Sequence, residues 1–319
     1  MQNKTKIIQN IQWQPVFRTI KWIVPFFIAL VLYKKFYKNT SFSFLHFKSQ
    51  LQQMDGLWYL LLIGFSALNW SIETWKWQFL VRKLEPISFK KALKSVLSGV
   101  AVSQLLPYRT GEYLGRLAYI SDRNKLSAGF LSVAGSFAQL LATLTFGVLA
   151  FTYLKPIPYP SYALGLFIAL FVLLCVGYFY LPQFRRFKRF VFFEVLRSAF
   201  MRLKTKDLFI IFALSVLRYA TFVIPYALMA HHFNLPVSSS LYAGITAVAC
   251  IYFLQTISPN FILTDIVIRM SVPALVFSGQ MEAVSGMEYI PGMFIYLFNI
   301  AIPMCLGAVI LLLVKLKKQ

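Results

Sequence analysis

The sequence predicts an all-α fold, a polytopic transmembrane helical bundle of about six full spans with two interrupted helical hairpins. Of its 319 residues 59% are hydrophobic and the mean hydropathy is +0.67, whereas soluble domains are about 45–50% apolar. Only 13% of the residues are charged. The 32 lysines and arginines, against 10 acids, stand in short clusters between long apolar runs, as in the cytoplasmic loops of membrane proteins.

The charge and the length of the polar segments exclude two other classes of protein. A net charge of +22 is compatible with a nucleic-acid partner, but the basic residues do not line one soluble face, so we expect no nucleic acid. The longest polar stretch, about 182–206, is far shorter than a self-standing domain. We therefore treat 1–319 as a single integral membrane domain.

Apolar segments set the expected spans, because a helix that crosses a bilayer needs about 20 mostly apolar residues. Six segments qualify: 16–36, 57–81, 127–153, 161–181, 207–230 and 292–314. Two further apolar regions, 88–122 and 238–279, are interrupted by proline and by charges. We expect each of these two regions to form a pair of shorter helices, as a re-entrant hairpin or as tilted spans.

The loops between the spans differ in their content of lysine and arginine. The segments 82–94, 185–206 and 315–318 are rich in these basic residues, and most of the other loops are poor in them. The positive-inside rule then places these basic segments and both termini in the cytoplasm. It also places the interrupted region 88–122 on the cytoplasmic side and 238–279 on the opposite side.

The two interrupted regions share a motif. In each, an acid follows a proline by five or six residues and an arginine follows the acid by four: Pro107, Glu112 and Arg116; Pro259, Asp265 and Arg269. In the first motif Gly111 and Gly115 permit close approach of a neighbouring backbone. Matching interruptions in halves of opposite orientation point to an inverted-repeat transporter, with halves at about 57–181 and 207–314. A chance pairing of short motifs is the alternative.

Seven charged side chains lie in apolar regions and are candidates for a site. They are the arginines Arg109, Arg116, Arg218 and Arg269 and the acids Glu73, Glu112 and Asp265. Arg218 stands in mid-span, where a cation costs roughly 2.5–3.5 kcal/mol, so it should face protein or a wet cavity. It forms either a structural ion pair with Asp265 or Glu112, or a contact with a ligand.

The spacing of these charges favours an anionic ligand. Glu112 and Arg116, like Asp265 and Arg269, are four residues apart and can pair on one helix face, which is also compatible with a purely structural role. Four arginines against three carboxylates leave about one cation to be matched by an anion or by water. Because arginine binds phosphate oxygens bidentately, we expect a lipid phosphate.

A second polar group lies late in the segment 57–81. Asn69, Glu73 and Trp77 recur every four residues and share one helix face, with Lys76 beside them. The simplest interpretation is an aromatic belt at the membrane interface, with Lys76 extending its amine toward water. Asn69 and Glu73 are therefore secondary candidates for binding.

The remaining reactive residues predict neither catalysis nor metal binding. Cys175, Cys250 and Cys305 lie in apolar segments, as small hydrophobic residues do. His231 and His232 have no acid at ligand spacing, and the chain offers no arrangement of a nucleophile with a base. We expect no enzyme activity, no metal and no cofactor.

Five short motifs are spread over nearly the whole chain. They are Asn69-Trp-x-x-Glu-x-x-Lys-Trp77, Leu106-Pro-x-Arg-x-Gly-Glu-x-x-Gly-Arg116, Gly135-Ser-x-Ala-Gln139, Asp265-x-x-x-Arg269 and Asn299-x-x-x-Pro303. Together they resemble the flippase-like lysylphosphatidylglycerol synthetase membrane-domain family, in versions from Bacteroidetes-type bacteria. The second hairpin departs from the family pattern, because Ile266 and Val267 stand where Gly often follows an acid.

The resemblance implies a function in lipid transport. In relatives this membrane domain moves a modified phospholipid across the bilayer, and a separate soluble domain makes that lipid by aminoacyl transfer. The chain holds no such soluble domain, so we expect no synthetase activity. By resemblance, the central polar set consists of Arg109, Glu112, Arg116, Asp265 and Arg269.

The leading hypothesis is a flippase-like lipid transporter of the bacterial inner membrane. An anionic phospholipid or lipid-linked phosphate binds between the two broken hairpins, with arginines on the phosphate. Glu112 and Asp265 hold the arginines in place or carry a proton. Two alternatives stay open: an accessory scaffold subunit of envelope assembly, and a transferase that acts on a polyprenyl-phosphate lipid.

Overall fold

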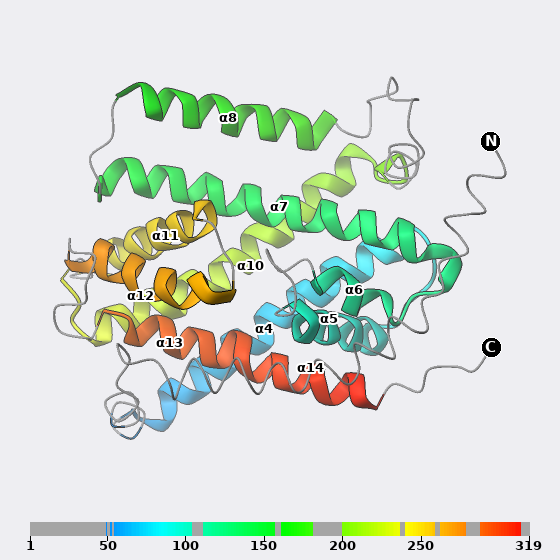
Figure 1. The fold of residues 1–319 in the computed structure, drawn as a ribbon, viewed down its shortest axis with the longest axis horizontal. Coiled ribbons are helices and arrows are strands. Elements are labelled where there is room, and N and C mark those ends of the chain that lie inside the picture. The colour runs from blue at the N-terminus through cyan, green and yellow to red at the C-terminus, as the bar shows by residue number, and fades with distance from the viewer. Residues whose placement is uncertain are drawn as a thin grey trace.

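The computed structural model describes residues 54–103, 111–156, 161–180, 200–236, 240–258, 262–278 and 288–313, together with Ser49 and Gln52. Every regular element in these ranges is a helix (Figure 1), which confirms the predicted all-α class. The predicted first span at 16–36, Arg109 and most of the basic run 185–206 lie outside the described residues.

The described helices follow the predicted segments closely. In chain order they are α4 (Gly56–Val81), α5 (Phe89–Ser103), α6 (Gly111–Leu117), α7 (Asp122–Leu154), α8 (Ser161–Tyr180), α10 (Thr205–His232), α11 (Leu241–Ile257), α12 (Ile262–Ser278), α13 (Ile290–Tyr296), the π-helix η3 (Leu297–Ala301) and α14 (Ile302–Leu312). The last three form one continuous segment. Each interrupted region forms a pair of helices, α5 with α6 and α11 with α12.

Three of the described segments are long and apolar enough to cross a membrane. They are α7, α10 and the continuous segment Ile290–Leu312. Shorter apolar stretches, Leu164–Tyr180 and Leu241–Ile257, lie in α8 and α11. The predicted span 57–81 forms α4, which has 26 residues but buries polar side chains along its C-terminal half.

The outer surface of the bundle differs from that of a water-soluble protein. Large apolar side chains are exposed on the outside of the bundle, among them Leu57 of α4 and Leu166 and Leu173 of α8. Charged side chains such as Glu73 and Lys76 are buried instead. Because lipid tails solvate apolar surface and not charge, this arrangement is suited to a bilayer and identifies a membrane protein.

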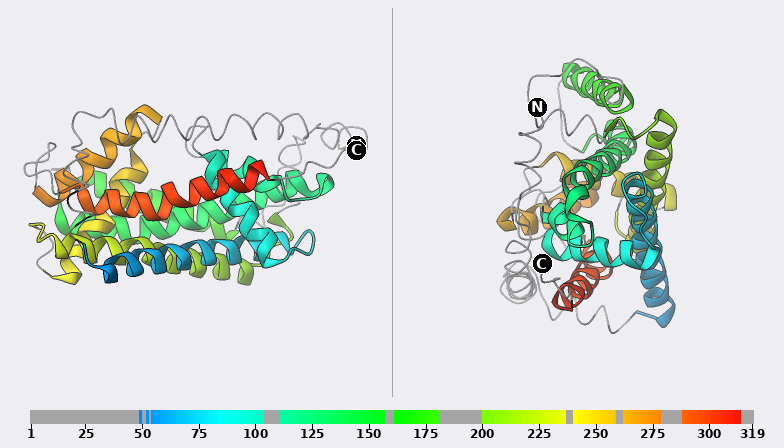
Figure 2. Two further views of the ribbon diagram at one scale, coloured as in Figure 1. Left: turned by 90° about the horizontal axis from the view of Figure 1, so that it is seen from below. Right: turned by 90° about the vertical axis from the view of Figure 1, so that its right-hand side faces the viewer.

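The two helix pairs lie at opposite ends of the bundle. In Figure 1, α4 and α10 run in opposite directions along the long axis, and each ends beside one of the pairs. The first helix of each pair packs against a long helix from the other part of the chain, α5 against α14 and α11 against α7. α4 and α10 contact each other, and Figure 2 shows them on one face of the bundle, away from α12.

Glycines let the first helix pair pack at backbone distance. A Cβ atom at Gly115 of α6 would lie 2.4 Å from the carbonyl oxygen of Ser98 in α5. A Cβ atom at Gly307 of α14 would lie 1.9 Å from the carbonyl oxygen of Leu97. α5 is therefore held closely between α6 and α14, as small residues permit in membrane helices.

Hydrogen bonds tie this helix pair to α4. The indole nitrogen of Trp77 donates to Ser95 Oγ at 2.9 Å, and Ser95 Oγ donates to the carbonyl oxygen of Arg116 at 2.8 Å. In the loop after α4, Glu85 accepts from Ser121 Oγ, from the backbone nitrogen of Ser121 at 3.3 Å and from Asn124 Nδ2 at 2.7 Å. Partial burial raises the pKa of Glu85, but these hydrogen bonds outweigh it and hold the pKa below its ordinary value.

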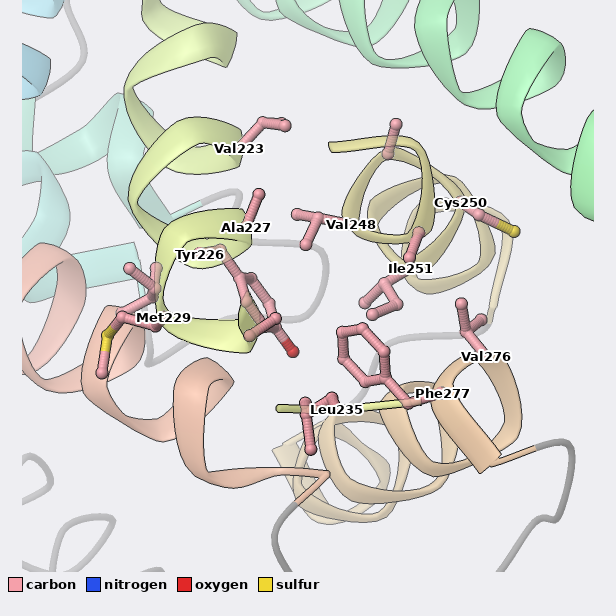
Figure 3. Close-up of a cluster of buried hydrophobic side chains, with 14 of the residues drawn as sticks. Val223, Tyr226, Ala227, Met229, Leu235, Val248, Cys250, Ile251, Val276 and Phe277 are labelled. Carbon is pink, nitrogen blue, oxygen red and sulfur yellow. The ribbon is translucent and has the colours of Figure 1, made fainter. Parts of the chain in front are cut away.

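The second helix pair is held by an apolar cluster. Side chains from α10, α11 and α12 interdigitate there, including Val223, Ile251 and Phe277 (Figure 3). Tyr226 of α10 points into this cluster, and its ring lies 6.4 Å from that of Phe277. Its hydroxyl is the one oxygen among the labelled side chains of Figure 3.

We expect Gly307→Ala to lower the melting temperature of the detergent-solubilised protein, because the added methyl group forces α14 away from α5. Overpacking of this kind costs about 1–3 kcal/mol. The matched control is Gly165→Ala on α8, where no atom lies within 4 Å of the added Cβ. Equal melting temperatures for the two variants would contradict the close α5–α14 contact.

Candidate functional site: a buried charge cluster beside a polar cavity

The centre of the site is the carboxylate of Glu73 in α4, whose residue is 3% exposed. Its Oε1 lies 2.7 Å from Nη2 of Arg116 in α6. Its Oε2 lies 2.8 Å from Nζ of Lys76 and 2.9 Å from Nη1 of Arg218 in α10. Three cations from three helices therefore share one carboxylate.

Arg116 joins a second carboxylate to this cluster. It pairs with Glu112, one turn earlier in α6, as the four-residue spacing predicts. Its guanidinium also lies over the ring of Trp77, 5.3 Å from the ring centroid. The described ion pairs thus connect Lys76, Arg116 and Arg218 to two carboxylates, which leaves the cluster with one net positive charge.

Lys76 lies inside the bundle. It is 1% exposed, and its Nζ lies 3.5 Å from the carbonyl oxygen of Gly135 in α7 and 3.3 Å from Ser215 Oγ in α10. Trp77 is completely buried. The interpretation of this stretch as an interfacial belt with Lys76 extended toward water is therefore wrong, because the buried carboxylate of Glu73 draws the amine inward.

Arg218 of α10 connects the charge cluster to Asn69 and to two aromatic rings beside it. The ion pair that the structure describes for it is with Glu73, a partner that the sequence analysis did not assign to it. Its Nε donates to Asn69 Oδ1 at 2.9 Å. Its guanidinium lies over the rings of Trp70 and Phe222, 5.3 Å from each centroid.

A proline explains how α4 is joined to the C-terminal segment. Pro303 has no N–H to donate to the carbonyl group of Asn299 four residues earlier, and its ring crowds that carbonyl. The helix widens there into η3. The carbonyl oxygen of Asn299 accepts instead from the indole nitrogen of Trp70 at 3.2 Å, and Asn299 Oδ1 accepts from Asn69 Nδ2 at 3.3 Å.

A cavity of about 530 Å³ opens beside the charge cluster, within the size range of ligand pockets. Arg218 of α10 and Arg269 of α12 both line it. Aromatic rings form much of the wall: Trp70, Tyr219, Phe222, Tyr226, Tyr252 and Tyr296. None of the described lining residues comes from the α5–α6 pair, so the cavity lies at the second helix pair and not midway between the two.

Several buried polar atoms around the cavity have no hydrogen-bond partner within the described protein. They are the hydroxyl oxygens of Tyr219 and Tyr226, Nδ2 of Asn299 and Oε1 of Gln139. Leaving such an atom unsatisfied costs about 1–3 kcal/mol. Gly292 gives Tyr226 its room, because a Cβ atom there would lie 2.7 Å from the tyrosine hydroxyl. All four atoms belong to residues that line the cavity, although the atoms themselves are buried in its wall.

The structure brings most of the predicted residues together. Glu112, Arg116, Arg218 and the secondary candidates Asn69 and Glu73 meet at the cluster, and Arg269 lies at the cavity with its guanidinium 5.4 Å from the ring centroid of Tyr296. Asp265 lies in α12, one turn before Arg269, but its side chain, like Arg109, is outside the described part. Within the described residues, no three His, Cys, Asp or Glu side chains could hold a metal ion.

Sequence reasoning missed four residues of the site. Lys76, Gln139 and Asn299 belong to the motifs that carry the family resemblance, and that membership was the available signal. Tyr226 belongs to none of these motifs and looks like any aromatic residue of an apolar helix. Only the fold reveals that its hydroxyl lies at the cavity.

An all-helical bundle with apolar outer faces and a buried charge cluster defines a polytopic membrane protein. A family model, the lysylphosphatidylglycerol synthase TM region, matches residues 22–264. The chain belongs to this family, which confirms the resemblance. The matched range covers the charge cluster and ends before Arg269 and Asn299. No curated protein and no solved structure matches the chain.

We expect Glu73→Gln to lower the free energy of unfolding by about 3–5 kcal/mol, because three buried cations lose their shared carboxylate. Denaturant unfolding in detergent measures this change. The matched control is Asp122→Asn, whose carboxylate is 53% exposed and pairs with Lys125. Because water reaches the half-exposed carboxylate of Asp122 and it holds one cation where Glu73 holds three, its loss should cost less, so similar losses in the two variants would contradict the central role of Glu73.

Proposed function

We propose that this protein is a transporter of the bacterial inner membrane, and not an enzyme, that binds an anionic lipid by its headgroup and moves it across the bilayer. One observation carries the proposal: Arg218 of α10 and Arg269 of α12 line the same cavity inside a helical membrane protein. Guanidinium groups at a cavity inside the bundle attract an anion even where, as at Arg218, they also contact a carboxylate of the protein. Their planar fork fits phosphate oxygens.

Membership of the family supports a lipid as the partner. The family is named after a synthase that modifies a lipid. The exposed apolar side chains of α4 and α8 give lipid tails a surface to contact. An anionic phospholipid or a lipid-linked phosphate offers the phosphate that two arginines bind. Its acyl or prenyl chains remain in the bilayer while the headgroup occupies the cavity.

We propose further that the two halves are inverted repeats with both termini in the cytoplasm. α4 and α10, of 26 and 28 residues, run in opposite directions, and each is followed by a helix pair. Arg116 and Arg269 stand in the second helix of their respective pairs. In transporters with this architecture, one repeat rocks against the other around a central site.

We expect Arg269→Gln to slow lipid transport about tenfold or more, because a charge-assisted hydrogen bond contributes about 1.5–3 kcal/mol. Proteoliposomes with tail-labelled phosphatidylglycerol measure the rate through bleaching of the label on the outer leaflet by dithionite. Arg218→Gln should show the same loss.

The matched control is Arg123→Gln, which replaces an exposed arginine at the start of α7. Transport rates are compared between proteins that have equal melting temperatures. Wild-type transport by both cavity variants would contradict the proposed function. If no transport occurs even in the wild type, and one protein partner co-purifies equally with wild type and Arg218→Gln, the scaffold hypothesis takes its place.

A further inference from the structure

The positions of the two helix pairs correspond to each other. The offset in residue number that relates Arg116 to Arg269 also relates Glu112 to Asp265. The same offset carries α5 onto α11, with a difference of one residue at each end, and it carries α6 onto the first half of α12. Each position of the first pair therefore has a counterpart in the second pair, and the two can be compared residue by residue.

Three glycines allow the first pair to close. An added Cβ atom at Gly99 of α5 would lie 2.7 Å from the carbonyl oxygen of Glu112 in α6. At Gly111 and Gly115 of α6, an added Cβ atom would lie 2.1 and 2.4 Å from carbonyl oxygens of α5. Since a real Cβ atom does not come so close to an oxygen, α6 can dock on α5 at this distance because these positions lack a side chain.

The second pair has a side chain at each of the three counterpart positions. They are Tyr252 in α11 and Thr264 and Ile268 in α12, and two of them, Tyr252 and Ile268, line the cavity. We propose that these two, which we call the spacer residues, hold α12 away from α11 and thereby create the cavity. The inference deepens the proposed function, on which it rests for the identity of the ligand but not for the opening of the cavity.

The ring of Tyr252 occupies the route by which the first pair reaches its long helix. In the first pair, Arg116 passes over Gly99, where an added Cβ atom would lie 2.9 Å from Arg116 Cγ, and its guanidinium reaches Glu73 of α4. In the second pair, the ring of Tyr252 lies against three aromatic rings of α10, with centroid distances of 6.1–6.2 Å. The guanidinium of Arg269 lies over a ring of α13.

The exposure of the last turn of α5 and of α11 agrees with this difference. Val102 and Ser103 at the end of α5 are each 1% exposed. Their counterparts in α11 are Gln255, which is half-buried, and Thr256, which is exposed, and both line the cavity. If α12 closed on α11 as α6 closes on α5, Thr256 would be buried as Ser103 is.

The reactivity of a cysteine at position 256 measures this opening directly. The full-length protein in detergent, with its native cysteines replaced by alanine, carries Thr256→Cys and reacts with a water-soluble maleimide. We expect the spacer variant Tyr252→Gly/Ile268→Gly to react about tenfold more slowly or slower still than the same protein with both spacer residues, because a buried thiol reacts only after local opening.

The matched control removes the same two kinds of side chain from exposed places. It carries Tyr242→Gly near the start of α11 and Ile168→Gly on α8. This control should react at the rate of the protein with both spacer residues, because neither position lies at the cavity. Equal rates in the spacer variant and in the control would overturn the inference.

A reciprocal experiment on the first pair decides the question if the spacer variant does not fold. Ser103→Cys should react slowly, and Gly99→Ala should make it react about tenfold faster, because the added methyl group forces α6 away from α5. Gly64→Ala of α4, where no atom lies within 4 Å of the added Cβ, is its matched control. A slow reaction in Gly99→Ala, equal to that in Gly64→Ala, would overturn the inference.

Transport of tail-labelled phosphatidylglycerol in proteoliposomes separates this inference from the proposed function. The spacer variant should lose transport, as Arg269→Gln does, and the control should keep it. If the spacer variant reacts slowly with maleimide but transports the lipid at the wild-type rate, the role of the spacer residues stands and the proposed function fails. If it reacts at the rate of the control, the spacer role is overturned, and the Arg269→Gln variant still tests the proposed function.

Discussion

Three cations on α4, α6 and α10 are held in the interior of the bundle by the carboxylate of Glu73. A buried charge that loses its partner costs several kcal/mol, so each of these helices must lie where its cation reaches the same two oxygens. This requirement fixes where the first helix pair docks on α4 and where α10 lies against α4. Gly115 lets α6 approach α5 at backbone distance, and Gly307 lets α14 do the same.

The charge cluster and the cavity form one connected system, and Arg218 belongs to both. Its Nη1 contacts Glu73, its Nε donates to Asn69, and its guanidinium lines the cavity. In the transport that we propose, an anion that draws Arg218 into the cavity weakens its contact with Glu73. Because Glu73 also holds Arg116 of the first helix pair, the same event reaches the opposite end of the bundle through a contiguous chain of polar contacts.

Hydropathy and local spacing predict the elements well, because each depends on residues close in the chain. The segments 57–81 and 207–230 form α4 and α10, both interrupted regions form helix pairs, and Glu112 pairs with Arg116 as an i,i+4 spacing suggests. The pair between Glu73 and Arg218 joins residues distant in sequence, and nothing in either neighbourhood indicates it. The prediction that the amine of Lys76 extends toward water is wrong for a related reason. A lysine among tryptophans near a helix end occurs both at a membrane interface and inside a bundle, so the local composition does not distinguish the two places.

Arg116 and Arg269 stand at corresponding places in the two helix pairs, yet their surroundings differ. Arg116 contacts two carboxylates of the protein, Glu73 and Glu112. Arg269 lines the cavity together with Arg218 and the aromatic wall. Arg116 is thus buried against protein carboxylates, whereas Arg269 stands at an open space. If the halves are inverted repeats, as we propose, this asymmetry places the headgroup in the second half, and the first half, held to Glu73 through Arg116, serves as the frame against which the second half moves.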